Sequence, residues 1–205
     1  MLKDACDPWS VHRRFRGLSR WLYPLITLDK PVVIGVNGHA VGGGMGLALT
    51  GDLLIAGESA KFMSGFFRLG AIPDIAMMYH LPRLIGMARA KNFLFSGATF
   101  SAQQAAELGL VYKVVPDKDL YAAGLREAQR LAEGPAEVMG LAKSLMARSF
   151  ETGLSEMFAF EGLGQALAMS NPEFREGLAA ALERRPSNFV DAAAKAEFAN
   201  GGGKA

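Results

Sequence analysis

The chain has 205 residues, half of them hydrophobic and a fifth charged, which is the composition of an ordinary globular protein with room for one substantial core. Its formal charge of +2 is too small to indicate a nucleic-acid partner, and no run of about 18 apolar residues is present to form a membrane span. The single cysteine, Cys6, excludes an intramolecular disulfide framework and suits a reducing compartment. We therefore expect a cytoplasmic protein that binds neither nucleic acid nor membrane.

The first third of the chain alternates between helical and strand-like patterns. Residues 8–27 place aromatic and leucine side chains at roughly helical spacing among arginines, which predicts an amphipathic helix. Pro31 then starts the β-branched run PVVIGV, which is typical of a strand buried on both faces. Three consecutive glycines, residues 42–44, follow this run. After them we expect a buried helix over 45–50 and strands over 53–56 and 61–63.

The middle of the chain is predicted to be mostly helical and to end in one more strand. Residues 75–96 have a helical pattern, with Pro82 near a helix start. Ser101 and Gln104 have the spacing of a capping box, so the next helix should begin there. A strand is expected over 110–115.

Beyond residue 116 only helical patterns remain. Glycine and proline punctuate this region and separate its helices. The helices are expected over residues 118–133, 135–149, 153–169 and 172–184. The terminal sequence NGGGKA indicates a disordered tail. The chain is thus predicted to be α/β in its first half and all-α afterwards.

The glycine turn between strand and helix allows two interpretations. A phosphate-binding loop needs Lys and then Ser or Thr after the glycines, whereas Met45 and Gly46 stand there. The dinucleotide fingerprint G-x-G-x-x-G is not matched in its usual form, and no acidic residue follows in the expected place. The glycines therefore serve either tight strand–helix packing or an anion site, because the N–H groups and dipole of a helix start attract negative charge. The pattern alone leaves both open.

Several motifs, in order along the chain, resemble the enoyl-CoA hydratase/isomerase (crotonase) superfamily. The segment KPVVIGVNGHAVGGGMGLALTGDLLIAGESAKF resembles the signature segment of that family. The likeness continues through LGAIPD and LPRLIGMARAKNFLFSGATFSAQQAAELGLVYKVVP and ends in NPEFREGLAAALERRPSNF, so that it spans about residues 30–189. It implies an α/β fold, a spiral of ββα units followed by a helical C-terminal trimerisation region.

The resemblance also implies a domain organisation and a set of partners. Residues 1–116 would form a partial spiral core with the glycine-turn oxyanion site, and residues 117–189 the helical oligomerisation region. Residues 190–205 would be a partly disordered tail. The implied substrate is an acyl-CoA thioester, with coenzyme A as part of the substrate, no other cofactor and no metal. The implied assembly is a homotrimer or a dimer of trimers.

Members of the superfamily carry a further N-terminal stretch that holds a motif like (S/C)AG.D and supplies the first oxyanion N–H group. This chain starts just beyond the expected place of that motif. The N-terminal part of the spiral is therefore expected to be missing from the sequence. Two explanations stand beside each other: a start placed inside a longer protein, or a shortened protein that assembles or binds without catalysis.

The acidic residues distinguish the members of the superfamily. The resemblance implies that Gly43 supplies the second oxyanion N–H. Hydratases carry two glutamates, at the positions of Gly46 and Phe66, and neither of these residues can activate a water molecule. Asp74 in LGAIPD stands where isomerases of the superfamily often carry an acid. The resemblance thus favours an acyl-CoA isomerase in which Asp74 moves a proton through an enolate, over a hydratase and over a non-enzymatic binding or assembly protein.

Other residues are predicted to bind the substrate around Asp74. They are the flanking glycines and four apolar side chains: Gly42, Gly44, Phe66, Phe67, Met77 and Met78. The isomerases have small residues after the acid, whereas this chain has the bulkier Ile75-Ala76-Met77-Met78, which would narrow the acyl pocket. An apolar pocket would raise the pKa of Asp74.

Two roles stay open for the charged candidates. Asp74 is also placed to cap a helix beginning near Ile75, and both of its roles are compatible. Arg184 and Arg185 are weak candidates for contacts with coenzyme A phosphates, and solvation at a helix end is the alternative for them.

Overall fold

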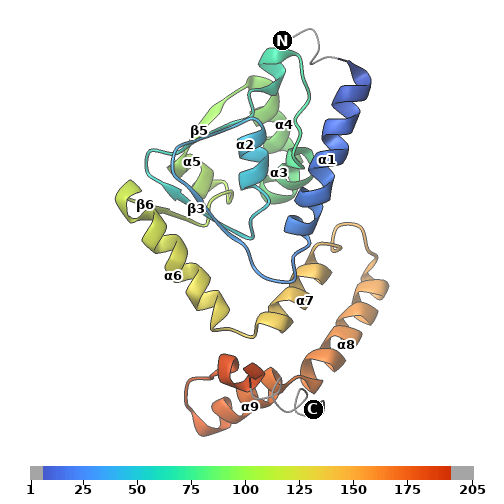
Figure 1. The fold of residues 1–205 in the computed structure, drawn as a ribbon, viewed down its shortest axis with the longest axis vertical. Helices are drawn as coiled ribbons and strands as arrows, with labels where there is room; N and C mark the ends of the chain where they lie inside the picture. Colours follow the sequence, from blue (N-terminus) through green and yellow to red (C-terminus); the bar gives the residue numbers. More distant parts are fainter. Residues whose placement is uncertain (1–6, 195–205) are drawn as a thin grey trace, which may run out of the picture. The chain divides into compact units, whose positions relative to one another are not determined.

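The computed structural model describes residues 7–194, which divide into two compact units. One unit is formed by residues 7–28 and 32–125, the other by residues 29–31 and 126–194 (Figure 1). The first unit contains, in chain order, α1 (Pro8–Ile26), β1 (Val33–Val36), β2 (His39–Val41), α2 (Gly43–Ala48), β3 (Leu53–Gly57), β4 (Lys61–Met63), α3 (Met77–Ile85), α4 (Met87–Ser96), β5 (Thr99–Ser101), α5 (Ala102–Glu107) and β6 (Lys113–Val115). The boundary lies within α6 (Leu120–Ala132), and the second unit continues with α7 (Ala136–Met146), α8 (Leu154–Ser170) and α9 (Pro172–Glu183).

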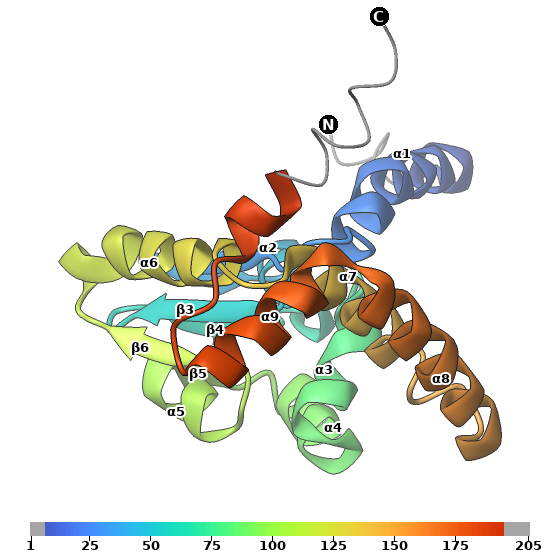
Figure 2. The same ribbon diagram turned by 90° about the horizontal axis from the view of Figure 1, so that it is seen from below.

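The strands of the first unit form two three-stranded sheets. One sheet has the order β1-β3-β6 and is parallel throughout. The other has the order β2-β4-β5, with β2 and β4 parallel and β5 antiparallel to β4. The first four strands therefore alternate between the sheets, since β1 and β3 enter the first and β2 and β4 the second. Figure 2 shows β3 and β6 side by side, with α5 next to them.

One main apolar core stabilises this unit. Its largest fully buried side chains come from β4 and three helices, and smaller buried side chains of β1 and β3 bring the other sheet into the same core. The largest ones are Phe62 on β4, Phe93 on α4, Met45 on α2, and Met77 and Leu81 on α3. Burying such side chains contributes about 1.5–3 kcal/mol each, which makes this core the dominant stabilising element of the unit.

Most of the predicted elements are confirmed, and the differences have physical reasons. Strands β2 and β5 were not separated from their surroundings in the sequence, because three residues are too few for an alternating pattern. The helix after the glycines begins at Gly43 rather than at residue 45. Pro82 lies inside α3 and not near its start, because the buried Met77, Leu81 and Ile85 form an i, i+4, i+8 stripe that holds the helix against the core.

The predicted capping box is confirmed in the first unit, and a second side-chain contact, from Asp52, ties two strands together there. The hydroxyl of Ser101 accepts a hydrogen bond from the N–H of Gln104 at 3.2 Å, and Gln104 Oε1 accepts from the N–H of Ser101 at 2.9 Å, which completes the capping box. Asp52 Oδ2 accepts from the N–H of Val32 at 2.7 Å and so ties the start of β3 to the residue before β1.

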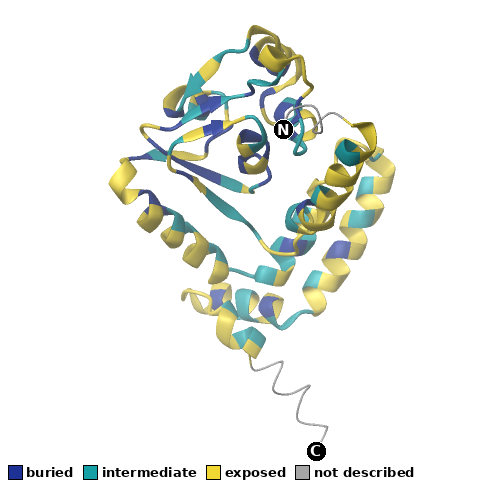
Figure 3. Cartoon of the chain, turned by 45° about the horizontal axis from the view of Figure 1, so that its top comes forward, coloured by how far each residue is buried: buried dark blue, intermediate teal, exposed yellow. Residues whose placement is uncertain are grey.

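The second unit is helical, and its helix α8 is mostly exposed (Figure 3). The exposed side chains on α8 include four large apolar ones, Leu154, Phe158, Leu163 and Leu167, each more than 60% accessible. An apolar surface of this kind is typical of an interaction site. The predicted tail over 190–205 lies largely outside the described residues.

A buried carboxylate, Glu173, lies in the first turn of α9 and is only 4% exposed. Burial raises its pKa, and the charge of Glu137 adds to this, while N–H groups from residues 136–138 at the start of α7 lower it; the net pKa is raised. Its Oε2 atom is buried without a hydrogen-bond partner. The charged form of Glu173 is therefore disfavoured in the folded state.

This raised pKa predicts a pH dependence of stability. A carboxyl group with a raised folded-state pKa contributes stability that is fully present below its unfolded pKa of 4.5 and is lost as the pH rises through the folded value. Glu173→Gln should remove that loss, so its free energy of unfolding should match or exceed the wild-type value at pH 7. Glu173→Ala also removes the oxygens that face the start of α7 and should cost about 1 kcal/mol, as loss of a helix cap does. Urea unfolding at pH 5 and pH 7 measures both, and a Gln variant with the wild-type pH dependence would contradict the assignment.

Candidate active site

The glycine turn places the first residues of α2 beside Phe66, Asp74 and Ile75. Gly42 precedes the helix with φ 56° and ψ −125°, a conformation that favours glycine, and its N–H donates to the carbonyl oxygen of Met63 at 3.0 Å. No side chain caps the helix at Gly42. The first N–H groups of a helix have no partner within it, so those of Gly43 and Gly44 are available to an acceptor at this end of α2. A partial positive charge accompanies them.

Asp74 lies directly against this helix start. A β-carbon at Gly43 would lie 3.6 Å from Asp74 Oδ1. That oxygen is buried and has no hydrogen-bond partner. Burial raises the pKa of Asp74 above its ordinary 3.8, and a hydrogen bond from its own backbone N–H partly opposes this. The structure therefore brings an acid with a raised pKa next to the available N–H group of Gly43.

The alternative role of Asp74 as a helix cap is not observed. Helix α3 begins at Met77 rather than near Ile75, and its capping residue, Ala76, makes no side-chain hydrogen bond. The contribution of Asp74 to this helix start comes from its backbone, since its carbonyl oxygen accepts from the N–H of Met77 at 3.0 Å. Its carboxylate therefore does not cap α3.

The two residues after Asp74 have a strained backbone. Ile75 has φ 48° and Ala76 has φ 56°, in the left-handed region that residues with a β-carbon avoid. Each such residue costs about 1–2 kcal/mol, and Ile is β-branched and disfavours this region more than Ala does. Strain of this size persists only where the surrounding packing determines it, and it is concentrated at functional sites.

Gly46 allows residues 74–75 to lie close to helix α2. A β-carbon at Gly46 would lie 2.8 Å from Ile75 Cβ and 2.9 Å from the carbonyl oxygens of both Asp74 and Ile75. Contacts this short with backbone atoms cannot be relieved by turning a side chain. The position at which the resemblance puts a hydratase glutamate is thus filled by residues 74–75.

The second position at which hydratases carry a glutamate is occupied by an aromatic side chain, that of Phe66. Phe66 begins a 3₁₀ turn over Phe66–Leu69, and its ring lies 3.8 Å from where a β-carbon of Gly42 would be. Phe67 packs on Phe95, with ring centroids 5.7 Å apart. The structure therefore brings Phe66 to the glycines and turns the next ring toward α4.

The two methionines after the acid differ in environment. Met77 is fully buried in the core, whereas Met78 is 56% exposed. The group that the structure brings together is Gly42, Gly43, Phe66, Asp74 and Ile75. Of these, Ile75 was anticipated only as a bulky residue. Its place over Gly46 could not be read from a spacing of 29 positions.

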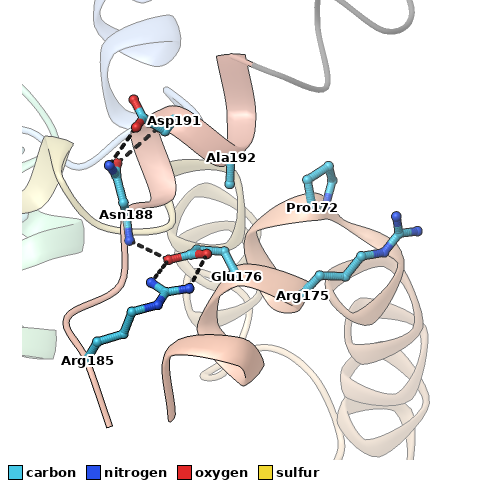
Figure 4. A pocket seen from close by; sticks show the side chains of 7 residues that line it. All are labelled: Pro172, Arg175, Glu176, Arg185, Asn188, Asp191 and Ala192. Carbon is cyan, nitrogen blue, oxygen red and sulfur yellow. Dashed lines mark hydrogen bonds and ion pairs between the residues drawn. The ribbon is translucent and has the colours of Figure 1, made fainter. Parts of the chain in front are cut away.

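The two candidate arginines belong to the second unit. Arg185 pairs with both carboxylate oxygens of Glu176, at 2.6 and 3.0 Å (Figure 4). It also pairs with Glu183 at 2.6 Å, and the hydrogen bonds to both carboxylates raise its pKa. Its guanidinium group is thus occupied by carboxylates. Arg184 ends α9 in the left-handed conformation, with φ 54°. Arg185, Glu176 and Arg175 line a pocket of about 500 Å³, whereas Arg184 does not.

Residues 7–194 offer no group of three His, Cys, Asp or Glu side chains arranged to hold a metal ion. In the same part of the chain, no helix is both long and apolar enough to cross a membrane.

Comparison with solved structures defines the class of fold. A crystal structure of an enoyl-CoA hydratase/isomerase from Cupriavidus metallidurans CH34 matches with a TM-score of 0.87 and 33% identity, over 92% of this chain and 72% of that one. The predicted α/β fold of the crotonase type is confirmed. The enoyl-CoA hydratase/isomerase family matches residues 13–192, and the chain belongs to that family.

Two curated relatives of nearly equal similarity are named for different reactions. The 1,2-epoxyphenylacetyl-CoA isomerase of Escherichia coli (strain K12) is 39% identical over 181 residues, which are 88% of this chain and 68% of that protein. A probable enoyl-CoA hydratase of Rhodobacter capsulatus is 38% identical over 169 residues, which are 82% of this chain and 66% of that protein. The chain therefore spans about two thirds of the length of these relatives, and the choice of reaction rests on the site.

Proposed function

We propose that the protein is an acyl-CoA isomerase that shifts a carbon–carbon double bond by proton transfer through a thioester enolate. Asp74 takes a proton from the carbon next to the thioester of a 3-enoyl-CoA. The electron pair of the broken C–H bond spreads onto the thioester oxygen, to which the Gly43 N–H donates a hydrogen bond. Asp74 then returns the proton two carbons further along, and the double bond becomes conjugated with the thioester.

One observation carries this proposal. The buried, unpartnered Asp74 Oδ1 faces Gly43, and both positions at which hydratases carry a glutamate hold other residues, Gly46 and Phe66. A single acid with a raised pKa suits proton removal and return at one site, because its two protonation states are then closer in free energy near neutral pH. Adding water across a double bond needs a held and activated water molecule, and Gly46 and Phe66 offer no group for that.

The remaining features of the proposal follow from the acyl-CoA chemistry. Coenzyme A is part of the substrate, and the reaction needs no further cofactor, because the product is an isomer of the substrate. We also propose a homotrimer or a dimer of trimers, supported by the exposed apolar side chains of α8. The mass in solution, measured by light scattering, checks this assembly.

Incubation with a 3-enoyl-CoA of medium chain length tests the reaction. We expect the absorbance of the conjugated 2-enoyl-CoA to appear, and crotonyl-CoA to be hydrated far more slowly. Faster hydration than isomerisation would contradict the proposal and favour a hydratase. If neither reaction occurs, the alternative is a non-catalytic member of the fold, and titration with acyl-CoA by calorimetry then measures whether it still binds the thioester.

A further inference from the structure

Ile75 occupies the space between the acid and helix α2. Its Cγ1 lies 3.4 Å from where a β-carbon of Gly43 would be, and its Cβ lies 2.8 Å from the corresponding point at Gly46. Asp74 Oδ1 approaches the same Gly43 from the preceding residue. The side chain of Ile75 therefore covers the turn of α2 that the carboxylate faces.

The conformation of Ile75 is specific to this contact. A positive φ at a β-branched residue is disfavoured, and the absence of a side chain at Gly46 is what lets the backbone of residues 74–75 come so close. Gly46 and Ile75 thus form a matched pair, in which one residue leaves the space that the other fills. A residue without γ-carbons at position 75 would leave part of that space open.

Apolar side chains lie on both sides of the start of α2. The Phe66 ring covers Gly42 and the Ile75 side chain covers Gly43 and Gly46, so the positions of both hydratase glutamates are apolar. Asp74 Oδ1, which faces Gly43, is buried without a hydrogen-bond partner. A water molecule stays beside apolar side chains only where several polar groups can hold it.

We propose that Ile75 is the specificity-determining residue that keeps water away from Asp74, so that the conjugated 2-enoyl thioester is released without being hydrated. The inference rests on the proposed function. In the favoured reaction one C–H bond breaks, another forms two carbons away, and the proton travels on Asp74, so no atom is gained or lost. In the competing reaction a water molecule adds its oxygen to the β-carbon of the conjugated product and its proton to the α-carbon.

Ile75→Ala tests this role, with Leu69→Ala as its matched control. Leu69 is an apolar side chain of the same size, lies at the end of the neighbouring 3₁₀ turn and is 84% exposed. Two measurements are made on the full chain of each variant. The first is the ratio of hydrated to isomerised product from a 3-enoyl-CoA. The second is the carboxylate titration of Asp74 by ¹³C NMR in protein labelled at aspartate, assigned with Asp74→Asn.

We expect Ile75→Ala to raise the hydrated share of the product by about tenfold, the change that a shift of ~1.4 kcal/mol between the two barriers produces. The titration midpoint of Asp74 should fall toward 3.8, because water then reaches a carboxylate whose pKa burial had raised. Leu69→Ala should change neither quantity.

An unchanged midpoint and an unchanged product ratio in Ile75→Ala would overturn the proposal. The titration needs no turnover, so it decides the role of Ile75 even if the protein fails to convert 3-enoyl-CoA; that failure would count against the proposed function alone. Ile75→Val keeps the branched β-carbon and should retain wild-type values in both measurements. A Val variant that behaves like Ala would also contradict the role assigned to the filled space.

Discussion

Replacing Asp74 by Asn is expected to slow the double-bond shift by about 10²–10⁴-fold, the range that a positioned general acid or base contributes. Asn has nearly the same shape as Asp but can neither accept the proton nor return it. The folded structure should tolerate the change, because Asn keeps a side-chain oxygen that can accept the hydrogen bond from the backbone N–H of residue 74. The measurement is the rate of conjugation of a 3-enoyl-CoA at saturating substrate, with thermal unfolding of both proteins as the control for folding.

The pH dependence of the reaction rate is a second test of Asp74 as the residue that moves the proton. Asp74 accepts a proton only when ionised, so the rate should rise with pH through a midpoint above 3.8, the direction in which burial shifts its pKa. The residual rate of Asp74→Asn should lack this rise. An Asn variant with an unchanged rate would remove Asp74 from the mechanism, and a wild-type profile that is flat across the acidic range would do the same.

Much of the fold could be predicted because local signals and the global fold agree. The capping box of Ser101 and Gln104, the breaks between the C-terminal helices and the β-branched strand before the glycines all follow from short stretches of sequence. The start of α3 could not be predicted in this way. Ile75 and Ala76 have left-handed conformations that neither residue type prefers, so the sequence indicates a helix there while the structure delays it to Met77.

The sequence suggested which residues belong to the candidate site but not how they pack against one another. The family motifs pointed to Gly43 and Asp74, and the structure places them against each other. Ile75 packs on Gly46, which lies 29 positions earlier in the chain. Hydrophobic periodicity and turn rules describe only neighbouring residues, so they could not predict this contact. What the sequence shows as a missing glutamate is, in the structure, a space taken by the segment that carries the remaining acid.

Gly46→Glu puts this interpretation to its strongest test, because it restores the residue type that the hydratases carry. If the missing acid were the only obstacle, the variant would hydrate crotonyl-CoA. The geometry predicts otherwise, since the new β-carbon would lie 2.8 Å from Ile75 Cβ and 2.9 Å from two carbonyl oxygens. The carboxylate of the new glutamate would also lie close to the buried carboxylate oxygen of Asp74, and two negative charges so close together disfavour each other.

We expect Gly46→Glu to lower the free energy of unfolding by about 3 kcal/mol, from overpacking together with an unpaired buried charge, and to produce no hydratase activity. Gly46→Ala should be destabilising as well, although alanine ordinarily favours a helix, because the clash involves the β-carbon itself. Gly44 supplies the matched control two positions earlier on the same short helix. A β-carbon at Gly44 meets no atom within 4 Å, so Gly44→Ala should be neutral or stabilising by up to about 1 kcal/mol.

Urea unfolding measures the stability of the three variants, and an assay with crotonyl-CoA measures whether Gly46→Glu has hydratase activity. A Gly46→Glu protein as stable as wild type would show that residues 73–76 move aside at little cost. The strain at Ile75 and Ala76 would then reflect a mobile segment, and the exclusion of water by Ile75 would lose its basis. The expected result, a destabilised protein that hydrates nothing, requires instead that hydration can return only when the loop after Asp74 is replaced together with Gly46.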